Sequence, residues 1–330
     1  MRRVLTLIVG VVMTTAVIAF VGCKEKGSGG GAKVHTVAPG TPLKLAFVTN
    51  NASDFWKIAV AGVHKYEKEA GVQVDIKMPP TGAVAEQKQI LENLLSQGYN
   101  GIAISVIAPA DETEEINTAA KQTNVICHDS DAPKSNRLLY IGTNNFDAGK
   151  VLGQEIVKLL PHGGKMAVFV GTFAADNAQK RLAGIENAIA GHNIEIVAKK
   201  EDYKDANKAR SNVENVINST PDISLLCGLW APNGPAIASA IDAAGKKGKI
   251  LAAVFDEDDG TLDGIANGII SCTVVQKPFE FGYLSSKWLN VLATQGESKL
   301  PADPNIDTGV EVIKASNVAE FRKKLAEMKK

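Results

Sequence analysis

Charged and amide side chains follow the ends of several short apolar runs, and their types suit hydrogen bonding to hydroxyl groups. Asp129 follows the run NVICH, and Asp256 follows KILAAVF. A carboxylate accepts bonds from two neighbouring hydroxyls, and the guanidinium of Arg181 donates in a fixed fork. Asn177 stands four positions before Arg181, so one face of a helix start can carry both. The alternatives are turn capping by Asp129 and a salt-bridged helix surface for Arg181.

Two adjacent aromatic residues in the stretch TNNASDFW raise a second question. On a helix, Phe55 and Trp56 point about 100° apart, so one can enter a core while the other goes elsewhere. Ser53 and Asp54 before them are good helix N-caps, and a ligand contact in addition stays open. The stretch LWAPNG in the second half of the chain also places an aromatic and an amide after an apolar run.

The chain alternates apolar runs with stretches of helical spacing, in two successive series. The predicted strands are 43–48, 72–76, 101–106, 124–128, 138–141, 165–170, 194–198, 223–228, 249–255, 269–275 and 310–313. The predicted helices are 55–69, 84–97, 110–121, 147–160, 177–190, 206–219, 234–244, 260–267, 279–294 and 317–329. Repeated βαβ units with short apolar strands predict parallel sheets covered by helices on both faces. The fold class is therefore α/β, with two doubly wound parallel-sheet domains, and about 290 residues suit two domains.

In doubly wound sheets, ligands bind beyond the carboxyl ends of the strands. Polar and aromatic residues stand there in both halves, so two such edges facing each other predict a cleft between the domains. The last predicted strand, 310–313, is followed by a charged terminal helix over 319–330.

Other kinds of site find less support. The motifs GxSxG and HExxH are absent, which disfavours a secreted hydrolase, and His128 beside Asp129 is interpreted as structural. The acidic run 256–259 does not have the spacing of a calcium loop. No metal or other cofactor is expected.

Charge and cysteine content bear on two further points, nucleic-acid binding and disulfide pairing. The sequence has 36 basic and 36 acidic residues; removal of Arg2 and Arg3 would leave 34 basic residues and a net charge of −2. Nucleic acid is therefore not an expected partner. Beyond Cys23, an odd number of cysteines excludes full pairing, and Cys127, Cys227 and Cys272 are expected to be buried thiols.

The first 22 residues have the features of a secretory signal peptide. Arg2 and Arg3 precede an uncharged apolar run that ends at Gly22. Cys23 follows directly and resembles the lipidated cysteine of bacterial lipoproteins, although Phe20 stands where Leu is usual. The alternative is an uncleaved membrane anchor. Residues 23–41 then form a flexible lipidated tether, which would hold the protein in the periplasm or on the extracytoplasmic membrane surface.

Over residues 43–315 the sequence resembles the periplasmic sugar-binding proteins of the ribose-binding type, the solute receptors of ABC importers. The resemblance is carried by FVTNNASDFW, GIAISVIAPAD, VICHDSDA, YIGTNNFDAGKVLG, AADNAQKRLAGI, ISLLCGLWAPNGPAIASAI, VFDEDDGTLDGIANG and TVVQKPFEFG. It implies two domains that close over a ligand and are joined by a three-segment hinge. The implied domains are 43–145 with 278–305, and 146–277 with 306–318.

The resemblance also implies the ligand-binding residues. They are Ser53, Asp54, Phe55, Trp56, Asp129, Asn177, Arg181, Tyr203, Trp230, Asn233, Asp256 and Gln276. Trp56 and Trp230 would sandwich a sugar ring, since an indole offers an apolar platform, with a place in the core as the alternative for Trp56. Ser130 replaces a family Arg and Trp230 a family Asn, which argues against plain ribose; Asp131 is a weak substitute for that Arg.

The implied function is that of a monomeric receptor, not an enzyme, which binds a monosaccharide or related polyol and delivers it to an ABC permease. Two alternatives stay open. One is a partner that presents its ligand to a membrane kinase or chemoreceptor. The other is a receptor for a non-sugar solute such as a nucleoside.

Overall fold

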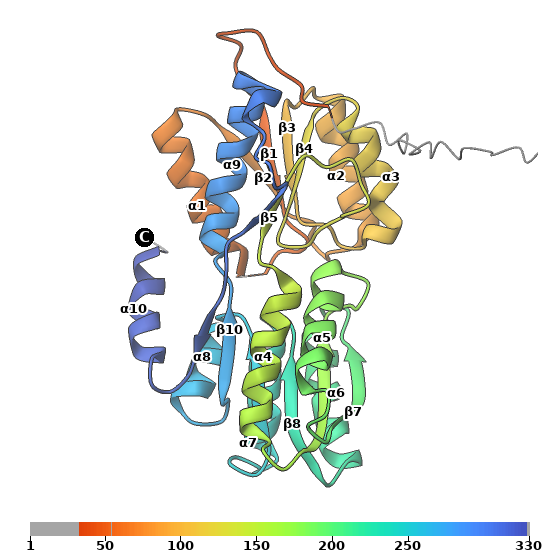
Figure 1. The fold of residues 1–330 in the computed structure, drawn as a ribbon, viewed down its shortest axis with the longest axis vertical. Coiled ribbons are helices and arrows are strands. Elements are labelled where there is room, and N and C mark those ends of the chain that lie inside the picture. Colours follow the sequence, from red (N-terminus) through yellow and green to blue (C-terminus); the bar gives the residue numbers. More distant parts are fainter. Residues whose placement is uncertain (1–32, 54, 329–330) are drawn as a thin grey trace, which may run out of the picture. The chain divides into compact units, whose positions relative to one another are not determined.

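The computed structural model describes residues 33–53 and 55–328, whose arrangement is drawn in Figure 1. The expected signal peptide, the lipidation site Cys23, the tether up to residue 32, and Asp54 lie outside the described residues. The described part contains two six-stranded sheets, as the alternating pattern of the sequence predicts.

The first sheet has the strand order β11-β5-β4-β3-β1-β2, and all its pairs are parallel. Its strands are β1 (Leu45–Val48), β2 (Val74–Lys77), β3 (Gly101–Ile104), β4 (Asn124–His128), β5 (Tyr140–Gly142) and β11 (Asn305–Asp307). Its helices are α1 (Phe55–Ala70), α2 (Val84–Ser96), α3 (Pro109–Ala120) and α9 (Pro278–Gln295). Helices α1 and α9 pack together, as do α2 and α3. We call this sheet with its helices the first lobe.

The second sheet has the corresponding order β12-β10-β9-β8-β6-β7. Its strands are β6 (Gly164–Val170), β7 (Ile194–Glu201), β8 (Ile223–Gly228), β9 (Leu251–Phe255), β10 (Cys272–Val275) and β12 (Glu311–Ile313). Its helices are α4 (Asn145–Leu159), α5 (Asp176–Ile189), α6 (Ala206–Ser219), α7 (Asn233–Ala243), α8 (Asp259–Ala266) and α10 (Val318–Met328). A 3-10 turn, η1 (Glu297–Lys299), follows α9. The second sheet with its helices is called the second lobe.

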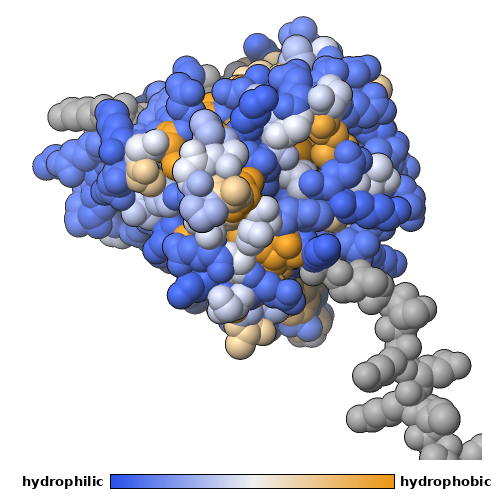
Figure 2. Space-filling view, turned by 90° about the horizontal axis from the view of Figure 1, so that it is seen from above, coloured by the Kyte–Doolittle hydropathy of each residue, from blue (hydrophilic) through white to orange (hydrophobic). Residues whose placement is uncertain are grey.

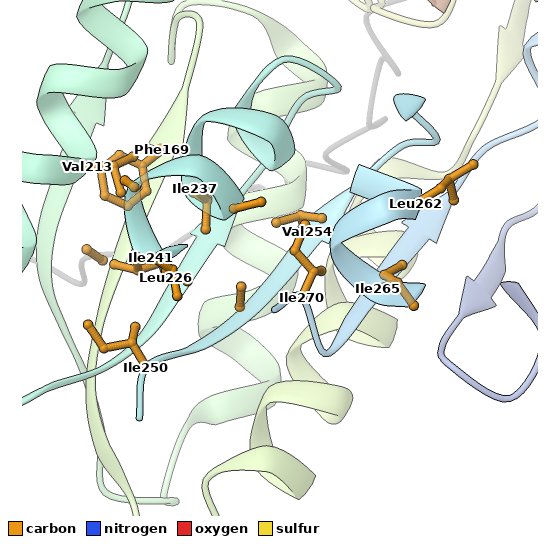
Figure 3. Packing of buried hydrophobic residues seen from close by; sticks show 14 of the residues in the cluster. Phe169, Val213, Leu226, Ile237, Ile241, Ile250, Val254, Leu262, Ile265 and Ile270 are labelled. Carbon is orange, nitrogen blue, oxygen red and sulfur yellow. The ribbon is translucent and has the colours of Figure 1, made fainter. Parts of the chain in front are cut away.

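The central strands of each sheet are buried on both faces, which explains why they are apolar along almost their whole length. Figure 3 shows one side of the second sheet, where Phe169 and Leu226 meet Val213 of α6 and Ile237 of α7. A separate cluster, which includes Val168 and Cys227, packs on the other side under α4 and α5. These layers hold the carboxyl ends of the strands in place, where the polar residues stand.

The chain crosses between the sheets three times, after β5, after β10 and after β11. β11 is a strand that the sequence pattern does not predict, because Asn305–Asp307 is short, partly exposed and polar. It pairs with β5, so the expected domain boundary at 305/306 falls within a strand of the first sheet. β12 is predicted, but it pairs antiparallel with β10 and so closes the second sheet differently from the other strands.

Cys127, Cys227 and Cys272 are free and buried, as predicted, and burial raises the pKa of each thiol. Within residues 33–53 and 55–328, no helix has the length and apolar character needed to cross a membrane. Figure 2 shows one face of the molecule, on which hydrophilic residues surround small, separate apolar spots.

Candidate functional site

A small cavity lies where residues that follow strands of both sheets meet. Its volume is about 30 Å³. That is room for a water or two and far below the ~300–1,000 Å³ of typical ligand pockets, so its walls are nearly in contact and a ligand requires them to separate. The residues that line this central cavity are Asn50, Asn51, Ser53, Phe55, Trp56, Asp129, Asn177, Arg181, Trp230, Ala231, Pro232, Asp256 and Gln276.

Asp129 is the carboxylate that the first lobe contributes. It directly follows β4 with a left-handed φ of 55°, which turns its side chain away from the strand direction. Its Oδ2 accepts hydrogen bonds from Ser105 Oγ at 2.7 Å and Asn50 Nδ2 at 3.4 Å. Burial raises the pKa of Asp129 to about 6, although Arg181 and the hydrogen bonds from Ser105 and Asn177 oppose the rise. The Asp129 carboxyl of the folded protein therefore gains or loses its proton at a pH near 6.

The segment between β1 and α1 forms the rest of this wall. Asn51 Oδ1 accepts from the Ser53 backbone N–H at 2.8 Å and from Trp56 Nε1 at 3.2 Å. Asn51 therefore helps to fix the segment that leads into α1, while capping of the helix by Ser53 or Asp54 stays a prediction. Ser53 and Phe55 nevertheless line the cavity.

Trp56 lines the cavity and is also part of the first lobe's core. Only 1% of the residue is exposed, and its ring meets Phe47, Phe55 and His128 edge-on at centroid distances of 6.1, 5.1 and 5.5 Å. Most of the Trp56 surface is therefore packed in the core, which is the alternative predicted for this residue. Stacking against a ligand stays a prediction for the face or edge that remains at the cavity.

Arg181 is the cation of the second lobe, and only 1% of it is exposed. Its Nε donates to Asn145 Oδ1 at 2.9 Å, and its Nη1 donates to the Leu229 carbonyl at 2.6 Å. The guanidinium lies over the Phe255 ring at 4.3 Å. Its Nη2 is buried without a hydrogen-bond partner among the residues that the structure describes. A buried unpaired donor of a cation is costly, so Nη2 is available to a ligand acceptor.

Asp256 follows β9 in the second lobe with a left-handed φ of 71°, like Asp129 in the first. Its Oδ2 lies 3.6 Å from Arg181 Nη1, and its Oδ1 accepts from Gln276 Nε2 at 2.8 Å. Burial raises the pKa of Asp256, while Arg181 and Gln276 oppose the rise. Within residues 33–53 and 55–328, Gln276 Oε1 is buried without a hydrogen-bond partner, so it can accept a ligand hydroxyl.

Trp230 closes the second lobe's wall. Its Nε1 donates to Asn177 Oδ1 at 3.2 Å, which ties it to the start of α5. Its ring lies against Gly171, where an added Cβ would stand 2.3 Å from Trp230 Cζ3. Only glycine allows this close approach. The indole is therefore positioned by packing as well as by its hydrogen bond.

Two of the residues predicted for the site lie outside the central cavity. Asn233 is buried behind Trp230, where its Oδ1 accepts from the Trp230 backbone N–H at 3.0 Å and its Nδ2 donates to Asp202 at 2.9 Å. It therefore positions Trp230. Tyr203 is 61% exposed, and Lys208 Nζ lies 4.0 Å from its ring centroid. It lines an adjoining groove of about 440 Å³ at the cleft mouth.

Neighbouring polar residues are engaged elsewhere. Asp131, a possible substitute for the family Arg, instead accepts from Arg137 Nε at 2.5 Å and Nη2 at 2.7 Å. His128 is buried and stacks on Phe47 at 4.1 Å, and burial lowers its pKa to about 3, which fits the predicted structural role. Among the residues that the structure describes, no group of three His, Cys, Asp or Glu is placed to hold a metal ion.

Nine predicted residues come together around the cavity: Ser53, Phe55, Trp56, Asp129, Asn177, Arg181, Trp230, Asp256 and Gln276. The sequence analysis missed Asn50, whose amide contacts Asp129, and Asn145, which orients Arg181. Asn50 stands two residues after β1, so its place beyond a strand end was a usable signal. Asn145 opens α4, and no local signal separates it from an ordinary helix start.

The arrangement can hold a polyhydroxylated molecule between two walls. Carboxylates and amides accept and donate to hydroxyls, a guanidinium donates in a fork, and indoles offer apolar faces.

Comparison with known proteins finds relatives over about two thirds of the chain. A xylose/arabinose-binding protein of Sulfolobus acidocaldarius is 29% identical over 248 residues, which are 70% of this chain and 60% of that relative's length. A ribose import binding protein of Bacillus subtilis is 27% identical over 232 residues, covering 68% of this chain and 73% of the relative. A crystal structure of an ABC transporter solute-binding protein from Burkholderia graminis in complex with D-arabinose superposes with a TM-score of 0.80. It is 31% identical and covers 85% of this chain and 98% of its own.

Residues 45–298 match the periplasmic binding protein domain. Because this match spans well over half of the sequence, and because the fold agrees with that of solved solute-binding proteins, the chain belongs to the periplasmic binding protein domain family.

Proposed function

We propose that the protein is a receptor that binds a monosaccharide or related polyol in the central cavity and delivers it to an ABC importer. The observation that carries the proposal is the meeting of Asp129 from one sheet with Arg181 and Asp256 from the other. Each wall alone offers only some of the side chains that can hydrogen-bond to hydroxyls. A ligand that contacts both walls favours the closed arrangement, because the full set of contacts forms only there.

The unpaired buried atoms support a ligand rich in hydroxyls. Arg181 Nη2 supplies a donor and Gln276 Oε1 an acceptor, while the two carboxylates accept hydroxyl protons. Two carboxylates against one guanidinium disfavour a ligand that carries a carboxylate of its own. Trp230 and Trp56 supply the apolar surface for a sugar ring.

The names of the relatives support both a sugar as the ligand and an importer as the partner. The Sulfolobus protein binds xylose or arabinose by its name, and the Bacillus protein is a ribose import binding protein. Family membership implies a place outside the cytoplasm. We extend this to a lipid anchor at Cys23, a monomeric receptor without enzymatic activity, and a permease as membrane partner. The role of a sensor partner is less favoured, because the Bacillus relative is named for import.

Isothermal titration calorimetry tests the proposal. The panel contains D-xylose, D-arabinose, D-ribose, D-glucose, myo-inositol and adenosine, and the matched control is Asp256→Asn. We expect one sugar or polyol to bind at micromolar concentration or tighter, about −8 kcal/mol or better, and the variant to lose most of that affinity. Heat with adenosine and none with any sugar or polyol would reject the sugar assignment.

A further inference from the structure

We propose that Lys204 is a latch residue, which holds the two lobes closed across the cleft mouth without touching the ligand. Its Nζ donates to the carbonyl oxygen of Gly82. Lys204 belongs to the loop between β7 and α6 of the second lobe, and Gly82 belongs to the loop before α2 of the first. Lys204 lines the adjoining groove of about 440 Å³ beside Tyr203, which we call the outer groove, but it does not line the central cavity. The inference rests on the proposed function, since a latch acts on ligand binding through closure.

The second lobe holds the lysine in an unusual backbone conformation. Tyr203 and Lys204 have left-handed φ angles of 54° and 68°, which non-glycine residues rarely adopt. The Lys204 backbone N–H donates to Asp202 Oδ1 at 2.7 Å, and the Tyr203 N–H donates to the Gly171 carbonyl at 2.8 Å. Such residues persist only where their surroundings fix them, and they cluster at ligand clamps and switch regions. These backbone hydrogen bonds therefore fix the direction in which the Lys204 side chain leaves the loop.

The first lobe offers a matching recess. Gly82 has a φ of +68°, and a Cβ added there would lie 2.6 Å from Lys204 Nζ and 2.9 Å from the Asn50 carbonyl. Burial lowers the pKa of Lys204, and the nearby acidic side chains of Glu112 and Glu86 oppose this by attracting the ammonium. Glu112 is fully buried, burial raises its pKa to about 7, and its Oε1 has no hydrogen-bond partner among the described residues. A cation from one lobe thus meets a carbonyl and acidic side chains on the other, which is electrostatic complementarity across a closing surface.

The same loop is connected to the ligand-binding wall. Asp202 binds the Lys204 backbone through Oδ1 and Asn233 Nδ2 through Oδ2, and Asn233 in turn binds the Trp230 backbone. Asp202 therefore positions both the latch and the indole. Lys204 and Trp230 are therefore held by one hydrogen-bonded network of the second lobe.

A contact made only in the closed form stabilises that form and slows ligand release, without changing the ligand's own contacts. A charge-assisted hydrogen bond in a half-buried place is expected to change the release rate about tenfold. The association rate should stay unchanged, because the open form lacks the contact.

The test uses Lys204→Met, which keeps the length of the side chain and removes its charge. The control is Lys200→Met, at an exposed lysine of β7. With D-arabinose as the probe, stopped-flow fluorescence should show release about tenfold faster in Lys204→Met and unchanged in the control. A melting curve verifies that each variant folds, and Gly82→Ala, which intrudes on the lysine from the other lobe, should speed release as well.

A second readout does not require sugar binding. Spin labels on Glu92→Cys of α2 and Asn207→Cys of α6, in a Cys23→Ser background, report the distance between the lobes; the three buried thiols resist labelling. Lys204→Met should shift the distribution to longer distances. Equal release rates would overturn the latch. If D-arabinose does not bind, equal distance distributions would overturn it, and the sugar proposal is judged separately by its own panel.

Discussion

We expect Asp129 to give the protein opposite pH dependences of stability and of ligand affinity. Burial raises the pKa of its carboxyl from the ordinary 3.8 to about 6 in the folded protein. The folded state therefore binds the proton more tightly than the unfolded state does. Stability contributed by this group is present below pH 4, is lost as the pH rises from about 4 to about 6, and stays constant above that. The rise corresponds to about 3 kcal/mol.

Affinity should change the other way. A sugar hydroxyl donates to the ionised carboxylate, so binding favours the deprotonated form. With a pKa of about 6, only about a tenth of the carboxyls are ionised at pH 5, and affinity there should be about tenfold weaker than at pH 7.

The perturbation is Asp129→Asn, which keeps the shape and removes the titration. Urea unfolding and calorimetry from pH 4 to pH 7.5 compare the two proteins. His128 titrates in both, so its contribution cancels in the difference. The wild type should lose about 2.4 kcal/mol more than the variant between pH 4 and pH 7, because part of the total of about 3 kcal/mol is already lost at pH 4. The variant should also bind more weakly, without the tenfold pH effect. Parallel stability curves, or equal pH dependences of affinity, would refute the reasoning.

Three further substitutions have specific expected outcomes. Gly171→Ala places a methyl group against the Trp230 ring, so it should shift tryptophan emission and cost about 1–3 kcal/mol in urea unfolding; unchanged emission would contradict the packing described. Trp56→Ala removes a residue only 1% exposed and should lower the free energy of unfolding by about 3–5 kcal/mol. Full stability of that variant would show that the indole faces the cavity instead. Arg181→Met leaves buried carboxylates without their cation and should cost about 3–5 kcal/mol at pH 7 and less at pH 5, because the Asp129 carboxyl, with a pKa of about 6, is mostly protonated there; an equal loss at both pH values would exclude the charge explanation.

The layered architecture could be predicted from the sequence because it rests on pattern. Buried parallel strands are apolar throughout, and helices between them carry a 3.6-residue period. β11 could not be found this way, since Asn305–Asp307 is polar and pairs only through its backbone. The antiparallel direction of β12 depends on the path of the returning chain, which no local pattern records.

The candidate site was predictable where residues stand directly beyond strand ends, as Asp129, Asp256 and Gln276 do. It was less predictable where a side chain acts through another. Asn233 has the right type and position, yet it supports Trp230 from behind. Tyr203 is aromatic and follows a strand, but the left-handed turn at this residue carries it to the cleft mouth.

A structure with a bound sugar tests the central claim most directly, because the claim is that one ligand is held by both lobes. We expect hydroxyls of a single monosaccharide or polyol to lie within hydrogen-bond distance of Asp129 in the first lobe and of Arg181 and Asp256 in the second. Sugar contacts confined to one lobe, or a sugar seated only in the outer groove beside Tyr203, would contradict it.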